Sequence, residues 1–197
     1  MNRTHFLKSF LGLGLISAWS CQTDQSTASR PTVESSAKPD SSSPYTGTLR
    51  TELKAAWARS EEMTLKNVEQ MPPDLFTFKY TDEAMTFSEQ WRHCVVFTCG
   101  QLANNIDIEN PYADIKLPVQ MPKADVIKEL KKMYAFVRQS VDELSDGQLL
   151  KDCSFAGDTI PVWRLFYALE NHIIHHRGQC IVYLRLSGIV PKGYYGW

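Results

Sequence analysis

The sequence has 197 residues, of which 43% are hydrophobic, 22% charged and 11% aromatic. This composition is typical of one globular domain, and it excludes a collagen, a coiled-coil rod and a chain that is disordered throughout. The 21 basic and 22 acidic side chains nearly balance, and no run of Lys and Arg forms a stripe that could follow a phosphate backbone. We therefore expect no nucleic-acid partner.

Residues 1–21 have the pattern of an export signal. Arg3 and Lys8 precede an apolar stretch at 10–19, which is too short to cross the ~30 Å hydrocarbon core of a bilayer. The stretch leads into Cys21 and resembles a bacterial lipobox, whose cysteine is acylated after cleavage. The sequence therefore predicts a lipoprotein-like signal peptide with lipidation at Cys21. Ordinary secretion and an uncleaved apolar anchor are the alternatives.

Residues 22–47 are rich in Ser, Thr and Pro and contain little apolar surface to offset the chain entropy of folding. We expect this segment to be a disordered tether. Removing residues 1–21 leaves 19 basic and 22 acidic groups, a formal charge of −3, so attraction to anionic lipid is not expected. The predicted location is the bacterial cell envelope or periplasm, with the lipid anchor as the sole contact with the membrane.

Residues 48–197 contain amphipathic segments of helical length. The first covers about 49–71 and ends at Pro72-Pro73, because proline cannot continue a helix. The second begins with the capping box Thr86-Phe87-Ser88-Glu89, in which two side chains satisfy free backbone amides, and extends to about 105.

The third segment begins at Pro122 and has the most regular helical stripe of apolar residues, and the fourth runs from near Pro161 to about 186, with Gly188 as its expected stop. Four helices with one apolar face each predict an all-α four-helix bundle. Residues 149–160 are expected to form a short β element before the last helix. The long connections predict at least one crossover or a short hairpin.

This domain contains four cysteines: Cys94, Cys99, Cys153 and Cys180. Export would permit disulfides between them. Cys94 and Cys99, however, lie about 140° apart around one helix, which disfavours a bridge between the two. We expect most of these cysteines to be small buried apolar side chains.

The histidines are the most informative residues. His172 and His176 are four residues apart, so they stand one above the other on one helix face, where both can bind one divalent cation. His93 on the second helix is the candidate third ligand. His175 points about 60° away from His172 and is expected at the edge of such a site. The alternative is a pair of hydrogen-bonded or solvent-facing histidines with no metal.

Two motifs resemble those of the DinB/YfiT-like superfamily of metal-binding four-helix bundles. One is the run HIIHHRGQ from His172, followed by YLRLSG and Val190-Pro191, and the other is EQWRH, which ends at His93. The resemblance covers about residues 48–197. It implies a divalent metal ion (zinc, nickel or iron) held by His93, His172 and His176 with open positions for water, and a homodimer in some members. The better understood members are cytoplasmic and use low-molecular-weight thiols. The predicted export signal of this chain does not match a cytoplasmic location.

Three neutral imidazoles leave the ion its full double charge, so a water or thiol at its open position would be strongly acidified. Such a water could serve in hydrolysis, and such a thiol in thiol transfer, on a small-molecule substrate. His175 is the candidate catalytic base. Glu170 is turned away from His172 and is a poor base. His175 could instead only cap a hydrogen bond. Cys180 is either a fourth ligand or a buried residue, and Arg177 pairs with an acid of a neighbouring helix or binds an anionic substrate.

Two functions are therefore compatible with the sequence. The first is an exported, lipid-anchored, metal-dependent hydrolase or thiol transferase. The second is a non-catalytic helical bundle at the cell envelope that a metal stabilises or that binds a partner. Replacing His172 by Ala is expected to distinguish them, because a large drop in melting temperature with no detectable chemistry would favour the second.

Overall fold

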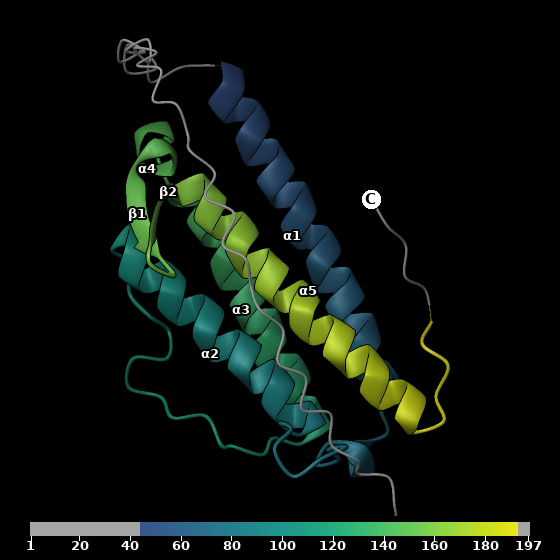
Figure 1. The fold of residues 1–197 in the computed structure, drawn as a ribbon. Helices are drawn as coiled ribbons and strands as arrows, with labels where there is room; N and C mark the ends of the chain where they lie inside the picture. Colours follow the sequence, from purple (N-terminus) through teal and green to yellow (C-terminus); the bar gives the residue numbers. More distant parts are fainter. Residues whose placement is uncertain (1–43, 193–197) are drawn as a thin grey trace, which may run out of the picture. The chain divides into compact units, whose positions relative to one another are not determined.

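The structure is a computed structural model that describes residues 44–192 (Figure 1). The long helices are α1 (Pro44–Gln70), α2 (Phe87–Ile106), α3 (Lys123–Glu143) and α5 (Val162–Leu186). The shorter elements are η1 (Pro73–Leu75), α4 (Asp146–Leu150), β1 (Asp152–Phe155) and β2 (Asp158–Pro161). The predicted all-α four-helix bundle, with a short β element before the last helix, is confirmed.

The predicted signal peptide, its lipidation site Cys21 and residues 22–43 of the predicted tether lie outside the described residues. Within residues 44–192, no helix is both long enough and apolar enough to cross a bilayer.

Helices that follow each other in the chain are not all neighbours in the bundle. α1 packs against α3 and α5, and α2 packs against the same two helices (Figure 1). α1 and α2 therefore lie at opposite corners, and the connection 71–86 crosses one end of the bundle. This confirms the predicted crossover, and it places α2 beside α5.

The core follows the predicted apolar stripes. On α3 the residues Val126, Leu130, Met133, Tyr134, Val137 and Val141 are all fully buried. Trp57 of α1 meets Tyr134 edge to face at 5.9 Å between ring centroids, which joins α1 to α3. Trp91 of α2 and Tyr183 of α5 are also fully buried. These large rings fill much of the space between the helices.

The helix ends agree with the sequence signals, with one difference. Both hydrogen bonds of the Thr86 capping box are present, and Gly188 has a φ of 76° where α5 ends. α1, however, begins at Pro44, before the expected domain boundary at residue 48. The reason is tertiary: the hydroxyl of buried Thr46 donates to Asp146 Oδ2 at 2.6 Å, which holds the first turn against α4.

The hairpin turn contains a residue in an unfavourable conformation. Ala156 has a φ of 53° and Gly157 a φ of 89°, and positive φ at both central residues is the pattern of a type I′ turn. An alanine in this left-handed region costs about 1–2 kcal/mol, whereas asparagine tolerates it.

We therefore expect Ala156→Asn to raise the free energy of unfolding by about 0.5–1 kcal/mol, measured by urea denaturation. Gly157→Ala is the matched control. A Cβ at Gly157 would meet no atom within 4 Å, so its expected loss comes from backbone conformation alone. An Ala156→Asn variant no more stable than the wild type would contradict this account of the turn.

Candidate metal centre

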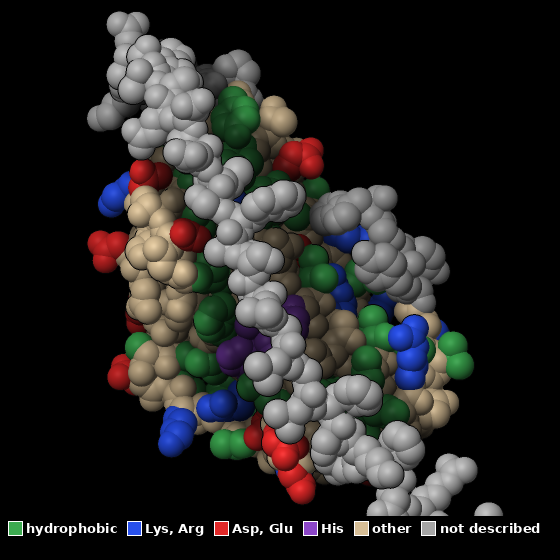
Figure 2. Space-filling model, viewed as in Figure 1, with side chains coloured by type: hydrophobic (Ala, Val, Ile, Leu, Met, Phe, Trp, Pro, Cys, Tyr) green, Lys and Arg blue, Asp and Glu red, His purple; other side chains and the backbone are tan. Residues whose placement is uncertain are grey.

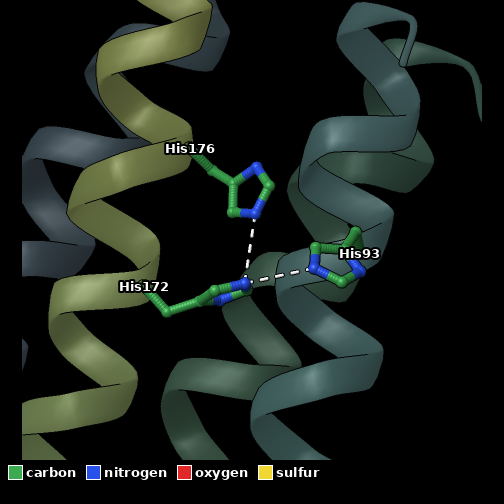
Figure 3. Close-up of side chains that lie close together, drawn as sticks. All are labelled: His93, His172 and His176. Atoms are coloured by element: carbon green, nitrogen blue, oxygen red, sulfur yellow. Dashed lines mark hydrogen bonds between the residues drawn. The ribbon is translucent and has the colours of Figure 1, made fainter. Parts of the chain in front are cut away.

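The three histidines predicted as metal ligands come from two helices that pack against each other. His93 lies in the middle of α2, and His172 and His176 lie one turn apart in the middle of α5. His176 is buried, and His93 and His172 are partly buried. Figure 3 shows the three rings converging on the space between the two helices. The predicted grouping of His93, His172 and His176 is therefore present.

The ring nitrogens lie at distances that suit one metal ion. Nε2 of His172 is 3.1 Å from Nε2 of His93 and 3.1 Å from Nε2 of His176, and the ligand atoms of all three lie within 4.8 Å of one another. A tetrahedral ion with bonds of about 2.05 Å needs ligand atoms about 3.3 Å apart. An octahedral ion with bonds of about 2.1 Å needs adjacent ligands about 3.0 Å apart. Both geometries are within reach of this trio.

Without a cation, these nitrogens cannot satisfy one another. Burial and the neighbouring imidazoles lower the pKa of His172 and of His176 to about 4, and burial followed by the charge of Arg92 lowers the pKa of His93. The rings are therefore neutral at pH 7. In a neutral imidazole, Nε2 carries either one proton or one lone pair. Nε2 of His172 can therefore form only one well-directed hydrogen bond, but it faces two ring nitrogens. The donor set fits a divalent cation.

His172 also has an unpartnered polar atom. Its Nδ1 is buried and makes no hydrogen bond within the described part of the chain. A buried polar atom without a partner is costly. Buried polar atoms without a partner often occur at functional sites, so the unpartnered Nδ1 is consistent with a binding role for the ring.

His176 is oriented by Gln90, a residue to which the sequence pattern did not point. Oε1 of Gln90 accepts a hydrogen bond from Nδ1 of His176 at 2.5 Å, and Gln90 is buried. Metal-binding histidines usually make such a contact through their second nitrogen, because it fixes the ring and the proton position. The signal that could have revealed Gln90 is its position one helical turn before His93, on the same face of α2.

Aromatic side chains cover one side of the trio. The ring of Phe97 lies 4.3 Å from the ring of His172, at an interplanar angle of 34°, and Phe155 of β1 lies 6.4 Å from Phe97. On the face of the molecule that Figure 2 shows, the histidines lie with hydrophobic side chains beside them. The hairpin between α4 and α5 therefore contributes to the apolar wall beside His172.

His175 lies outside the trio, as its angular position predicts. It is exposed, and its ring centroid is 5.1 Å from that of His176, at an interplanar angle of 88°. It is not among the residues whose ligand atoms meet at the site. Its role as catalytic base stays a prediction.

Arg177 and Glu170 form a buried pair on α5, with exposed fractions of 8% and 6%. Arg177 Nη2 lies 3.9 Å from Glu170 Oε1, and its Nη1 donates to the carbonyl oxygen of Ser60 and to Thr64 Oγ1, both at 3.3 Å. The acid therefore comes from the same helix, not from a neighbouring one, and α1 supplies neutral oxygens. Burial raises the pKa of Glu170, and Arg177 opposes this rise. Glu170 does not belong to the histidine group.

The four cysteines of the described residues are free. Cys94, Cys99 and Cys180 are fully buried, which confirms the prediction that most are small core residues, and Cys153 is partly buried. Cys180 does not join the histidine group, so the structure does not support a fourth ligand from this residue.

The buried thiols should be chemically inert. Burial raises the pKa of Cys99 to about 12 and also raises those of Cys94 and Cys180. Since the thiolate is the reactive form, we expect iodoacetamide at pH 8 to label these three at least ~100-fold more slowly in the native protein than in denaturant. Peptide mass spectrometry resolves each site. Native labelling of Cys180 as fast as that of Cys153 would contradict its burial.

Comparison with known proteins identifies the family. The family model of the DinB superfamily matches residues 56–180, which include the three histidines. The uncharacterised protein YrdA of Bacillus subtilis is 26% identical over 144 residues, which cover 72% of this chain and 84% of YrdA.

Two solved structures share the fold. A DinB-like protein from Bacillus cereus is 20% identical, with a TM-score of 0.61 over 74% of this chain and 97% of its own. The DinB-like protein YjoA from Bacillus subtilis is 18% identical, with a TM-score of 0.60 over 73% and 97% of the two chains. Because the family model covers more than half of the sequence, the chain belongs to the DinB superfamily.

Proposed function

We propose that the protein binds one divalent transition-metal ion through Nε2 of His93, His172 and His176, and that it uses this ion in hydrolysis or thiol transfer on a small-molecule substrate. The observation that supports this most directly is the convergence of three imidazoles, in which Nε2 of His172 lies 3.1 Å from Nε2 of His93 and 3.1 Å from Nε2 of His176. Imidazole ligands suit zinc, nickel and iron alike, so these three ions are the candidates.

Three protein ligands leave at least one coordination position for water or substrate. An ion held by neutral ligands keeps its double charge and, when bound, acidifies a water or thiol. The residues of the chain supply the rest of the site. Gln90 orients His176, and Phe97 covers one side of His172. His175, exposed beside His176, is the candidate proton acceptor.

Metal content tests the first part of this proposal. Protein purified without a metal-affinity step is analysed by elemental mass spectrometry, and about one ion per chain is expected for the wild type. His93→Ala should lose this ion, whereas the matched control His175→Ala should keep it, since His175 lies outside the trio. A wild type that carries no metal and cannot be loaded would overturn the proposal.

A purely structural metal is the second candidate, because the trio joins two neighbouring helices, α2 and α5. The catalytic and the structural role differ in whether the ion has a coordination position that an added ligand can occupy. In cobalt-substituted protein, added thiol or azide should change the visible absorption of the ion if a position is open. An unchanged spectrum, together with a metal-dependent rise in Tm, would favour the structural role.

We also propose that the protein is exported and anchored in the bacterial cell envelope by a lipid at Cys21. The support is the signal-like pattern of residues 1–21. Labelling growing cells with an alkyne fatty acid should tag the wild type and not Cys21→Ala. Label that persists in the variant, or a wild type without label, would contradict lipidation.

A further inference from the structure

A cavity of about 240 Å³ lies between α1 and α5, which pack side by side (Figure 1). Its described lining includes none of the three histidines of the proposed metal site. Arg177 lines the cavity because its side chain reaches Ser60 of α1, whereas its neighbour His176 contacts Gln90 of α2. The cavity and the metal site therefore lie on different sides of α5.

The walls of the cavity are one face of each helix and the segment that follows α5. The lining residues of each helix are three or four positions apart, which puts them on a single face. They are Met63, Asn67 and Gln70 on α1, and Arg177, Ile181 and Arg185 on α5. After α5, Gly188 turns the chain with a φ of 76°. Pro191 and Lys192 then line the cavity as well, and the backbone N–H of Lys192 donates to Gln70 Oε1 at 2.5 Å.

The charged residues that line the cavity are all basic. They are Arg177, Arg185 and Lys192, and no Asp or Glu of residues 44–192 lines it. Glu170 lies outside the lining and balances part of one charge, at 3.9 Å from Arg177. Positive charges gathered in one cleft repel one another and attract anions. The cavity therefore favours a ligand with negative charge.

Arg177 keeps hydrogen-bond donors that the protein does not use. Its Nη1 donates to the carbonyl oxygen of Ser60 and to Thr64 Oγ1, both at 3.3 Å. Its Nη2 lies 3.9 Å from Glu170, which is too long for a hydrogen bond, and its Nε makes none within residues 44–192. Nε and Nη2 form the edge of a guanidinium group that binds a carboxylate or phosphate through two parallel hydrogen bonds.

Asn67 has an unsatisfied amide group at the same cavity. Its side chain lines the cavity although the residue is only 5% exposed, and its Oδ1 is buried without a hydrogen-bond partner in the described part of the chain. A buried acceptor without a donor is costly. A hydroxyl or ammonium group of a ligand supplies the missing donor. Asn67 therefore indicates a polar ligand independently of the basic residues.

We propose that this cavity binds a small organic anion. Its carboxylate or phosphate head contacts the three basic side chains, its apolar body packs on Met63 and Ile181, and a donor group on it meets Asn67. The cavity is smaller than the ~300–1,000 Å³ of typical sites for drug-sized ligands, so the ligand has about ten non-hydrogen atoms. This binding site is independent of the proposed metal site.

Nuclear magnetic resonance titration of the full ¹⁵N-labelled chain tests the proposal. The probes are 4-hydroxybenzoate and phenyl phosphate, which carry the two kinds of anionic head on an apolar ring. A Kd of about 1 mM is expected for ligands of this size. The side-chain signals of Asn67 and of Arg177 Nε should shift on binding. Methyl 4-hydroxybenzoate has the same ring without the charge and should bind at least ~10-fold more weakly.

Three variants test the lining residues. Arg185→Gln and Lys192→Gln each remove one exposed cation and should each weaken binding by about 5–10-fold. Asn67→Asp keeps the shape of the side chain but adds a negative charge, so it should weaken binding more than ~10-fold. Arg164→Gln is the matched control, because Arg164 is exposed on the same helix and does not line the cavity. Circular dichroism checks that each variant is folded.

Metal loading separates this proposal from the proposed function. Chelator-treated and zinc-loaded protein should bind 4-hydroxybenzoate with the same Kd, since the histidines lie outside the cavity. Binding that requires zinc, or that shifts the signals of His93 and not those of Asn67, would place the anion at the metal and overturn the proposal. Anion binding by a protein that takes up no metal would support the cavity site and overturn the proposed function alone.

Two further results would also overturn the cavity site. One is a wild type that binds neither probe at about 20 mM, well above the expected Kd. The other is binding that Arg185→Gln and Lys192→Gln leave unchanged. Vesicles of phosphatidylglycerol provide the last comparison. If they bound more tightly than phenyl phosphate, and Arg185→Gln abolished this binding, the ligand would be a lipid head group and not a free small molecule.

Discussion

Divalent metal should raise the Tm of the wild type by about 8–16 °C and leave that of His172→Ala unchanged. A ligand at 1,000 times its Kd adds about 4 kcal/mol to the free energy of unfolding, and a domain of about 150 residues gains about 2–4 °C per kcal/mol. His172 is the informative position because its Nε2 faces both other ligand nitrogens at 3.1 Å. The measurement is calorimetry of chelator-treated protein, with and without added zinc or nickel.

The metal-free proteins give the necessary baseline. Without metal, His172→Ala should melt within a few degrees of the wild type, because the substitution removes a buried unpartnered Nδ1 together with a crowded nitrogen contact. His175→Ala, in the same turn of α5, should keep the full metal-dependent rise. If His172→Ala gained the same rise as the wild type, the ion would bind elsewhere and the assigned ligand set would be wrong.

Local sequence signals predicted several helix boundaries well because those boundaries have local causes. The capping box at Thr86, the proline pair after α1 and the left-handed Gly188 act within one turn of the chain, so they can be read without knowledge of the fold. The start of α1 could not be placed in this way. Its first turn is held by the contact between Thr46 and Asp146, which are 100 residues apart in the chain.

The same distinction applies to the site. The spacing of His172 and His176 is local and predicts a shared helix face. His93 was the candidate third ligand because it is the only histidine of residues 48–197 outside the last predicted helix, and the family resemblance agrees with it. The orientation of Gln90, the approach of Phe155 and the partner of Arg177 depend on how α5 packs against α2, α1 and the hairpin. Periodicity gives the buried face of a helix but not which buried polar groups meet there. Gln90 was therefore not singled out from the sequence, although it directly orients a ligand and lies one helical turn before His93.

Arg177→Met should lower the free energy of unfolding by about 3–5 kcal/mol, because it leaves the buried Glu170 carboxylate without its counter-charge. Chemical denaturation of the metal-free protein measures this loss without any contribution from the metal. Adding Glu170→Gln to the same variant should recover most of it, since no buried charge then remains. Lys54→Met is the matched control: Lys54 pairs with Asp142 at 2.6 Å at the surface, and its loss should cost at most about 1 kcal/mol.

The loss should also depend on pH in a defined direction. Burial already raises the pKa of Glu170 in the wild type, and without Arg177 it should rise further. The native state then binds this proton more tightly than the unfolded state, so acid favours folding of Arg177→Met through this group. The deficit should therefore be largest at pH 8 and should shrink as the pH falls toward the ordinary carboxyl range. The loss in the free energy of unfolding could instead be independent of pH and equally large in the double variant. That result would mean that lost packing of the arginine side chain, not the unpaired Glu170 carboxylate, destabilises the bundle.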